Sequence, residues 1–249
     1  MSVPAAAAVV AAAAAALVSV AVAVMPARST GARTGLVVSP YHHDPHNAIV
    51  AVRTSAPIIA LTFDDGPDPR YTPGVLAALN AARQHATFFV IGMAARRAPW
   101  LLRAIRGRGD EIGDHTLDHR RLPPLPSALV EREVVGGARA IAAIADRPPD
   151  LFRPPYGYFD RRVSALVAHA RLQLVGWDVA VEHFLHGRTA AEAARAVARA
   201  TRPGDILLLH DGGGRRGATL ATLRALLPLL AQRGLRSVTV SRLLRAGGA

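Results

Sequence analysis

The segment Ile58-Ile59-Ala60-Leu61-Thr62-Phe63-Asp64-Asp65-Gly66-Pro67 decides the fold. Its apolar first part has the length and composition of a buried strand, and Gly66-Pro67 then turns the chain. Two adjacent carboxylates after a buried strand repel each other unless a cation or a shared proton relieves the repulsion. The segment therefore predicts a buried strand that ends at a site of chemistry.

Beyond this strand, short apolar runs alternate with longer segments of helical periodicity. Such alternation implies parallel pairing and an α/β architecture, which could close into an incomplete or distorted (β/α) barrel of about seven parallel strands. The further strands are expected at Thr87–Ile91, Glu111–Gly113, Leu151–Arg153, Leu172–Trp177, Asp205–Leu209 and Ser237–Val240. The helices are expected at Pro73–Arg83, Ala94–Arg108, Ser127–Ala145, Asp160–Ala170, Thr189–Ala200 and Ala218–Arg233, with Asp160 as an N-cap and Gly234 as a stop signal.

The composition suits one large globular domain, because 51% of the 249 residues are hydrophobic and 19% are charged. The absence of cysteine excludes disulfides, thiolate catalysis and cysteine-based zinc sites. A net charge of +12 favours acidic partners, namely anionic wall polymers, membrane surfaces or nucleic acid. The arginines are scattered and aromatic residues make up only 5%, so we expect no nucleic-acid partner.

The N-terminal part reads as a targeting segment. An apolar run over 5–24 is long enough to cross a bilayer, so we interpret residues 1–25 as a signal peptide or membrane anchor and expect an exported protein, secreted or anchored facing the cell wall. Arg28 and Arg33 follow the run, and the positive-inside rule would oppose export; a non-native or misassigned N-terminus is the alternative. Residues 26–56 are interpreted as a linker and lead-in, and 57–245 as the domain.

Three further polar clusters follow predicted strands. If their segment is helical, His115 and His119 lie on one face and could chelate one ion, with Asp114 and Asp118 near enough to orient an imidazole. In Arg153-Pro154-Pro155-Tyr156-Gly157, the prolines would hold the backbone extended and present the Tyr156 N–H as an oxyanion donor. His210 closes an apolar strand and could serve as a general acid.

These clusters belong together, because active sites of parallel barrels lie at the C-terminal ends of the strands. One aspartate and two histidines could bind a metal and leave positions open for water and substrate. A metal of this kind lowers the pKa of bound water from about 15.7 to about 7. A spare aspartate, a spare histidine and an oxyanion donor complete the requirements for metal-assisted hydrolysis of an acyl group.

With its TFDDGP, HTxxH, RPPYG and LLLH motifs in this order, the chain resembles the polysaccharide deacetylase family, the NodB-homology group of carbohydrate esterases (family 4), from about Pro57 to Leu244. The resemblance implies a distorted (β/α) barrel and a divalent metal, usually zinc, with cobalt or nickel as alternatives. The implied roles are metal ligand for Asp65, His115 and His119, base for Asp64, acid for His210, and partner of Asp64 for Arg153. The implied pocket for the acetyl methyl group is lined by Leu208, with Pro155, Trp177 and Phe184 beside it.

One segment departs from the family pattern. Where many members carry DxxDW, this chain has Ala180, His183 and Phe184. Phe184 can replace the tryptophan as an apolar wall, whereas His183 cannot supply a fixed negative charge. We therefore expect Arg153 to use Asp178 or Glu182 instead, or to be held less firmly.

The leading hypothesis is an enzyme that removes N-acetyl groups from peptidoglycan or a chitin-like glycan. An O-deacetylase of xylan or acetylated wall sugars would use the same site. A catalytically weak carbohydrate-binding relative and a cytosolic hydrolase of small amides are further alternatives, disfavoured by the intact Asp64, Asp65, His115, His119 and His210 and by the N-terminal apolar run respectively. The sequence makes no prediction of the oligomeric state.

Overall fold

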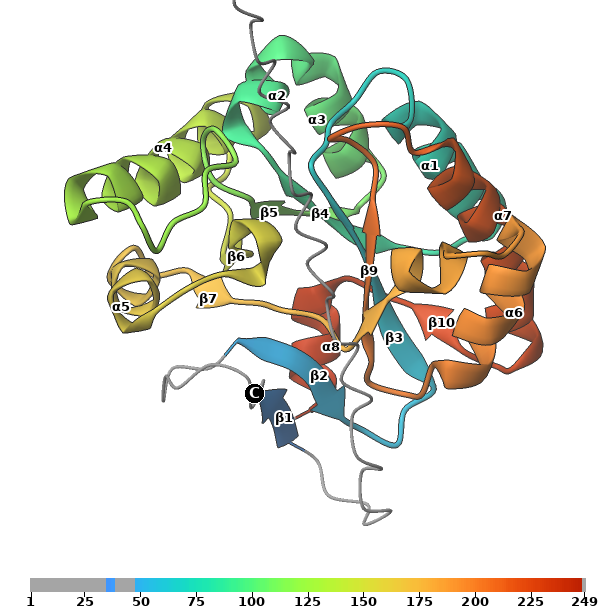
Figure 1. The fold of residues 1–249 in the computed structure, drawn as a ribbon. Helices are drawn as coiled ribbons and strands as arrows, with labels where there is room; N and C mark the ends of the chain where they lie inside the picture. The colour runs from blue at the N-terminus through green and yellow to red at the C-terminus, as the bar shows by residue number, and fades with distance from the viewer. Residues whose placement is uncertain (1–34, 39–47, 248–249) are drawn as a thin grey trace, which may run out of the picture. The chain divides into compact units, whose positions relative to one another are not determined.

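A curved sheet of parallel strands forms the centre of the domain (Figure 1). The computed structural model describes residues 35–38 and 48–247, so the predicted signal or anchor over 1–25 lies outside the described residues. Seven strands run in the order β7-β6-β5-β4-β3-β9-β8, and the short β10 (Arg236–Ser237) pairs with the start of β3. The seven are β3 (Ile58–Asp64), β4 (Ala86–Val90), β5 (Glu111–Asp114), β6 (Leu151–Phe152), β7 (Gln173–Leu174), β8 (Val179–Ala180) and β9 (Ile206–His210). This is the predicted distorted barrel.

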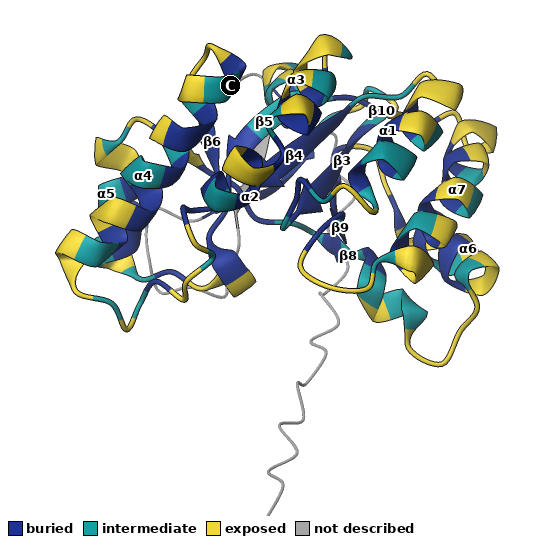
Figure 2. Ribbon diagram, turned by 90° about the horizontal axis from the view of Figure 1, so that it is seen from above, coloured by how far each residue is buried: buried dark blue, intermediate teal, exposed yellow. Residues whose placement is uncertain are grey.

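Helices cover the outside of the sheet, with their apolar sides on the strands and their exposed sides outward (Figure 2). Parallel strands covered in this way are buried on both faces, and β4 is buried along its whole length. The α-helices are α1 (Thr72–Ala81), α2 (Gly92–Arg97), α3 (Pro99–Gly107), α4 (Ser127–Ala145), α5 (Arg161–His169), α6 (Ala190–Ala200), α7 (Gly217–Gln232) and α8 (Val240–Ala246), and the 3₁₀ turns are η1 (Pro155–Gly157) and η2 (Val181–Leu185).

Several helix predictions are confirmed in detail. Helix α4 has the predicted bounds, and the Asp160 side chain caps α5 by accepting a hydrogen bond from the Val163 N–H at 2.8 Å. The single helix predicted over Ala94–Arg108 is wrong, because Pro99 cannot continue α2 and instead begins α3. The strand predicted at Ser237–Val240 is observed only as the short β10, because Thr239 already caps α8.

Strand β2 (Ile49–Arg53) connects the segment after the edge strand β7 to the segment before β9. Its Ile49 carbonyl accepts from the Gly176 N–H beyond β7, and its Val52 N–H donates to the Gly204 carbonyl before β9, both at 2.8 Å. It also pairs antiparallel with β1 (Gly35–Val38). The predicted linker over 26–56 therefore differs from the structure at its C-terminal end, where β2 is part of the barrel.

The core has an outer part, an inner part and a third cluster, in which Phe152 and Leu174 of β6 and β7 pack with Val134 of α4 and Val163 of α5. The outer part lies between the sheet and helices α1, α3, α4, α6 and α7. The inner part lies within the barrel, where β2, β3, β4 and β9 face α8 through apolar side chains that include Ile49, Phe89, Ile206 and Leu243. This packing fixes the strand ends that carry the polar residues. Among the described helices, none is both long and apolar enough to cross a membrane.

Candidate active site

The polar residues predicted from sequence gather at the C-terminal ends of the central strands. Asp64 is the last residue of β3 and His210 the last of β9, and the parallel register places these two residues opposite each other. His115 directly follows β5, which is two strands from β3. The strand-end placement expected for a barrel active site is therefore confirmed.

Asp65, His115 and His119 form a compact cluster whose ligand atoms all lie within 4.8 Å of one another. The Asp65 Oδ1 is 3.4 Å from the His115 Nε2 and 3.1 Å from the His119 Nε2. This buried oxygen nevertheless has no partner of hydrogen-bond geometry among the described residues. Two imidazole nitrogens and one carboxylate oxygen converging on one point fit a divalent metal such as zinc.

A backbone carbonyl orients the first histidine of the cluster. The His115 Nδ1 lies 2.7 Å from the Arg153 carbonyl oxygen, which identifies Nδ1 as the protonated nitrogen and leaves the Nε2 lone pair facing Asp65. The sequence had assigned this orienting role to Asp114 and Asp118. Asp118 is instead exposed, 3.6 Å from Arg132, because its side chain points out of the loop.

The loop that carries the two histidines is not helical. The four-residue spacing would have placed both histidines on one face only if the segment were a helix. Thr116 and His119 both have positive φ angles, of 70° and 60°, and Asp65 has a φ of 70°. The Thr116 hydroxyl accepts a hydrogen bond from the His119 N–H at 2.9 Å and so closes the turn. Left-handed backbone at non-glycine residues is costly and concentrates at functional sites.

The second oxygen of Asp65 is held by a residue that the sequence analysis missed. The Arg216 Nη2 lies 3.3 Å from Asp65 Oδ2. Burial alone would raise the pKa of Asp65, but contacts with His115 and His119 outweigh burial and hold the pKa well below its usual range. Arg216 follows the glycine-rich turn at 212–214, where a Cβ at Gly213 would collide with the Asp65 carboxylate.

Asp64 and Arg153 form a buried ion pair. The Arg153 side chain is fully buried, and its Nη1 donates to Asp64 Oδ1 at 2.8 Å and to the Thr62 hydroxyl at 2.7 Å. Its Nη2 donates to the Gly176 carbonyl oxygen at 2.7 Å. The expectation that Arg153 relies on Glu182 is therefore wrong, because Glu182 contacts His210. The buried Nε of Arg153 has no hydrogen-bond partner among the described residues.

Glu182 contacts His210 instead. Its Oε1 accepts from the His210 backbone N–H at 3.0 Å, lies 3.0 Å from the His210 Nδ1, and is 3.3 Å from the Thr219 hydroxyl. Burial lowers the pKa of His210, but Glu182 and then Asp64 outweigh burial and raise the pKa above its usual value. The carboxylate thus favours a His210 that carries a proton on both ring nitrogens.

Asp211 supports the loop that carries Asp64 and Asp65. The Thr72 hydroxyl donates to Asp211 Oδ2 at 2.5 Å, and the Asp211 N–H donates to the Asp64 carbonyl oxygen at 3.1 Å. Burial raises the pKa of Asp211 to about 7. A Cβ at Gly66 would collide with the Asp211 carboxyl group, which shows how closely the two loops pack.

Tyr156 lies at the edge of the Asp65–His115–His119 cluster. Its φ of 61° breaks the extended backbone predicted after the two prolines. Its backbone N–H has no hydrogen-bond partner among the described residues, and its ring centroid is 4.8 Å from that of His119. A free N–H beside the cluster can donate to an oxyanion.

The predicted pocket residues occupy different environments. Leu208 and Pro155 are buried, the Trp177 ring lies 5.6 Å from the Arg153 guanidinium carbon, and Phe184 packs partly against the outer core. Asp178 donates its backbone N–H to Ile206, and His183 is exposed. The acetyl pocket and a role for Asp178 or His183 stay predictions.

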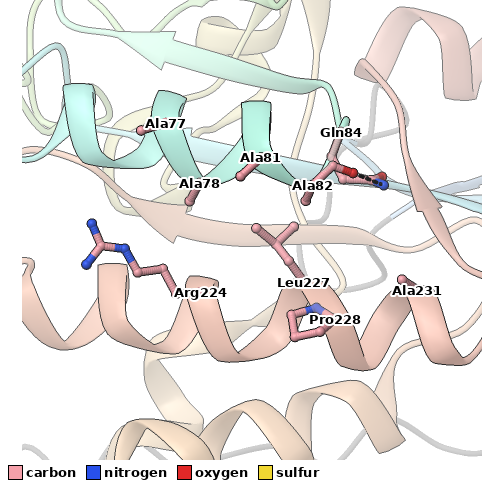
Figure 3. Close-up of a pocket in the computed structure, with 9 residues that line it drawn as sticks. All are labelled: Ala77, Ala78, Ala81, Ala82, Gln84, Arg224, Leu227, Pro228 and Ala231. Atoms are coloured by element: carbon pink, nitrogen blue, oxygen red, sulfur yellow. Dashed lines mark hydrogen bonds between the residues drawn. The ribbon is translucent and has the colours of Figure 1, made fainter.

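A separate groove of about 570 Å³ lies between α1 and α7 (Figure 3). Its walls are Ala77, Ala78 and Ala81 on α1 and Leu227 and Pro228 on α7, with Arg224 at one end. The residues that line it include no carboxylate and no histidine.

Comparison with known proteins places this geometry in context. The sequence model of the family described as polysaccharide deacetylase matches residues 51–175. The chain is 40% identical over 189 residues to a peptidoglycan-N-acetylglucosamine deacetylase of Bacillus cereus, covering 76% of this chain and 88% of that one. It is 39% identical over 193 residues to a chitooligosaccharide deacetylase of Sinorhizobium fredii, covering 73% and 89%. A crystal structure of a peptidoglycan N-acetylglucosamine deacetylase superposes with a TM-score of 0.74 at 27% identity, covering 79% of this chain and 92% of that one.

Proposed function

The chain belongs to the polysaccharide deacetylase family, and from that premise we propose that it hydrolyses N-acetyl groups of peptidoglycan or a chitin-like glycan with the help of a divalent metal. Polysaccharide deacetylases are hydrolases of linear amides. The observation that carries the proposal is the convergence of Asp65 Oδ1 with the Nε2 atoms of His115 and His119.

Asp65, His115 and His119 would hold the metal, which we propose to be zinc, with cobalt or nickel able to replace it. The protein supplies one oxygen and two nitrogen ligands, a set that suits zinc and leaves positions open. When bound, the metal polarises the acetyl carbonyl and makes a water molecule more acidic. Arg216 and the Arg153 carbonyl keep the ligands oriented.

Asp64 is the proposed general base. Its Oδ1 is occupied by Arg153, whereas its Oδ2 lies 3.9 Å from the His115 Nε2 and faces the cluster. This leaves Oδ2 as the oxygen that would accept a proton from water.

His210 is the proposed general acid. It lies opposite Asp64 across the β3–β9 pair, and Glu182 raises its pKa. The protonated imidazole would pass a proton to the nitrogen of the departing amine, which needs one to leave. The Tyr156 N–H would stabilise the oxyanion, and one such donor contributes about 3–4 kcal/mol to lowering the barrier.

The proposed substrate is a glycan of the cell wall. The two sequence relatives named above act on peptidoglycan N-acetylglucosamine and on chitooligosaccharides. The net charge of +12 favours an anionic wall polymer. Action on such a polymer requires export, which we propose to depend on the apolar run over 5–24. A cytoplasmic, soluble reporter fused to residues 1–35 would contradict this part.

The proposal is tested by acetate release from chitin oligomers, peptidoglycan and acetylated xylan, with and without added zinc. We expect metal-dependent acetate from an N-acetylated glycan, and Asp65→Ala should lose bound metal and activity together. Asp68→Asn is the matched control, because Asp68 lies in the same loop but contacts Arg70 at 2.7 Å. Acetate from xylan alone would instead establish an O-deacetylase. Full activity of Asp65→Ala would rule out the ligand set.

A further inference from the structure

Two exposed tyrosines lie beside the candidate site. Tyr156 and Tyr158 are 58% and 45% exposed and are two of the three most exposed large apolar side chains among the described residues. Their ring centroids are 6.4 Å apart. Exposed aromatic rings cost free energy in water and therefore mark surfaces that bind a partner or ligand.

Arg121 lies over both rings. Its guanidinium carbon is 4.3 Å from the centroid of Tyr158 and 5.9 Å from that of Tyr156. Arg121 is exposed and forms no ion pair with a described residue. Asp118, the acidic residue of the same loop, is 3.6 Å from Arg132 instead. The rings thus hold in place a positive charge that no described carboxylate neutralises.

This patch of Arg121, Tyr156 and Tyr158 is continuous with the Asp65–His115–His119 cluster. The Tyr156 ring is tilted against His119 at a centroid distance of 4.8 Å. The patch thus offers a surface over Tyr156 and toward Arg121 for the sugars next to an acetyl group that reaches the cluster. Sugar rings present apolar C–H faces that pack on aromatic rings, and a guanidinium binds a carboxylate through two parallel hydrogen bonds.

We propose that Arg121, held by Tyr156 and Tyr158, forms a subsite for a carboxylate-bearing unit next to the sugar that is deacetylated. The inference rests on the proposed deacetylase function and narrows its substrate to acidic glycans. In peptidoglycan the carboxylate is either the lactyl group of peptide-free N-acetylmuramic acid or a carboxylate of a stem peptide. Neutral chitin oligomers offer neither.

The test compares wild type, Arg121→Gln and Arg120→Gln on chitotetraose and on peptide-free glycan of alternating N-acetylglucosamine and N-acetylmuramic acid. Arg120 is the matched control, because it is the adjacent exposed arginine and has no recorded ring contact. Arg121→Gln should lower kcat/KM on the acidic glycan about fivefold, through KM, as expected for a solvent-exposed ion pair. Chitotetraose turnover should change less than about twofold in both variants, and added salt should shrink the wild-type preference.

Other outcomes overturn or redirect the inference. Equal losses on both substrates would mean that Arg121 only supports the fold. Unchanged kinetics on both, and also on glycan with intact stem peptides as a third substrate, would remove the subsite. A loss seen only on glycan with intact stem peptides would assign the carboxylate to the peptide. Calorimetric titration of the same glycans separates the two proposals: Arg121-dependent binding without acetate release would retain the subsite while the deacetylase function fails.

Discussion

Asp64 and Asp114 occupy equivalent places in the molecule, yet their carboxyl groups have opposite surroundings. Each is the last residue of a parallel strand, β3 or β5, and each is buried. Asp64 has the Arg153 guanidinium at 2.8 Å. Asp114 has no partner of normal hydrogen-bond geometry among the described residues, although the Thr116 backbone partly offsets the effect of burial.

The comparison shows that both strand ends are buried, whereas only Asp64 has a cationic partner beside it. Burial raises the pKa of Asp114 well above its usual range, and the nearby Glu133 raises it further. Burial therefore favours the neutral form of Asp114, which packs against Gly137 of α4, where a Cβ would collide with it. Asp64, the proposed base, has the buried Arg153 guanidinium as its partner.

The largest effect is expected from Arg153→Met, which leaves Asp64 buried without its cation. Breaking a buried pair by removing one partner costs about 3–5 kcal/mol of the free energy of unfolding. Urea unfolding of the chelator-treated protein measures this loss, and acetate release should disappear with it. The double variant Asp64→Asn/Arg153→Met should be more stable than Arg153→Met, since it leaves no unpaired charge. A double variant that is less stable would contradict the ion-pair account.

A smaller effect is expected from Asp114→Asn, which replaces a neutral acid with a neutral amide of the same shape. We expect a loss of about 1 kcal/mol, the scale of one unsatisfied polar group. The same urea experiment measures it, with Asp118→Asn as the exposed control in the adjoining loop. A loss as large as that of Arg153→Met would show that Asp114 is ionised in the folded protein.

The smallest effect on stability, and a distinct effect on pH dependence, is expected from Glu182→Gln. Glu182 raises the pKa of His210, so its contribution to stability is present below the unfolded pKa of histidine and is lost as pH rises through the folded pKa. Without this charge the pKa of His210 falls. The alkaline limb of the kcat/KM profile should therefore move to lower pH, because the general acid must be protonated. An unmoved limb would remove His210 as the acid or Glu182 as its partner.

Local sequence patterns predicted most of this architecture, because they reflect burial and chain geometry. The apolar run ending at Asp64, the bounds of α4 and the Asp160 cap follow from rules that act within a few residues. Pro99 indicates the break between α2 and α3, but the helical periodicity on both sides of it led to the prediction of one continuous helix. Strand β2 was not predicted, because its short apolar run lies next to segments without a regular pattern.

The partners within the site could not be predicted in the same way. Glu182 and His210 are 28 residues apart, and only the packing of η2 beside β9 brings them together. Arg216 contacts Asp65, which is 151 residues away in the sequence. The left-handed backbone at His119 could not be predicted either, because no glycine occupies that position. Residue types at the strand ends identified the chemistry, but long-range packing selected the pairs.

The register between β3 and β9 has a consequence for how such an enzyme can diversify. Asp64 and His210 are paired across neighbouring strands, so backbone hydrogen bonds of the sheet set the separation of the proposed proton acceptor and the proposed proton donor. Arg121 and Tyr158 stand on connecting loops outside that frame. Loop sequences can therefore change to suit a new polymer while the proposed acid–base pair keeps its spacing. The reaction and the substrate preference would then depend on different parts of the chain, which can evolve separately.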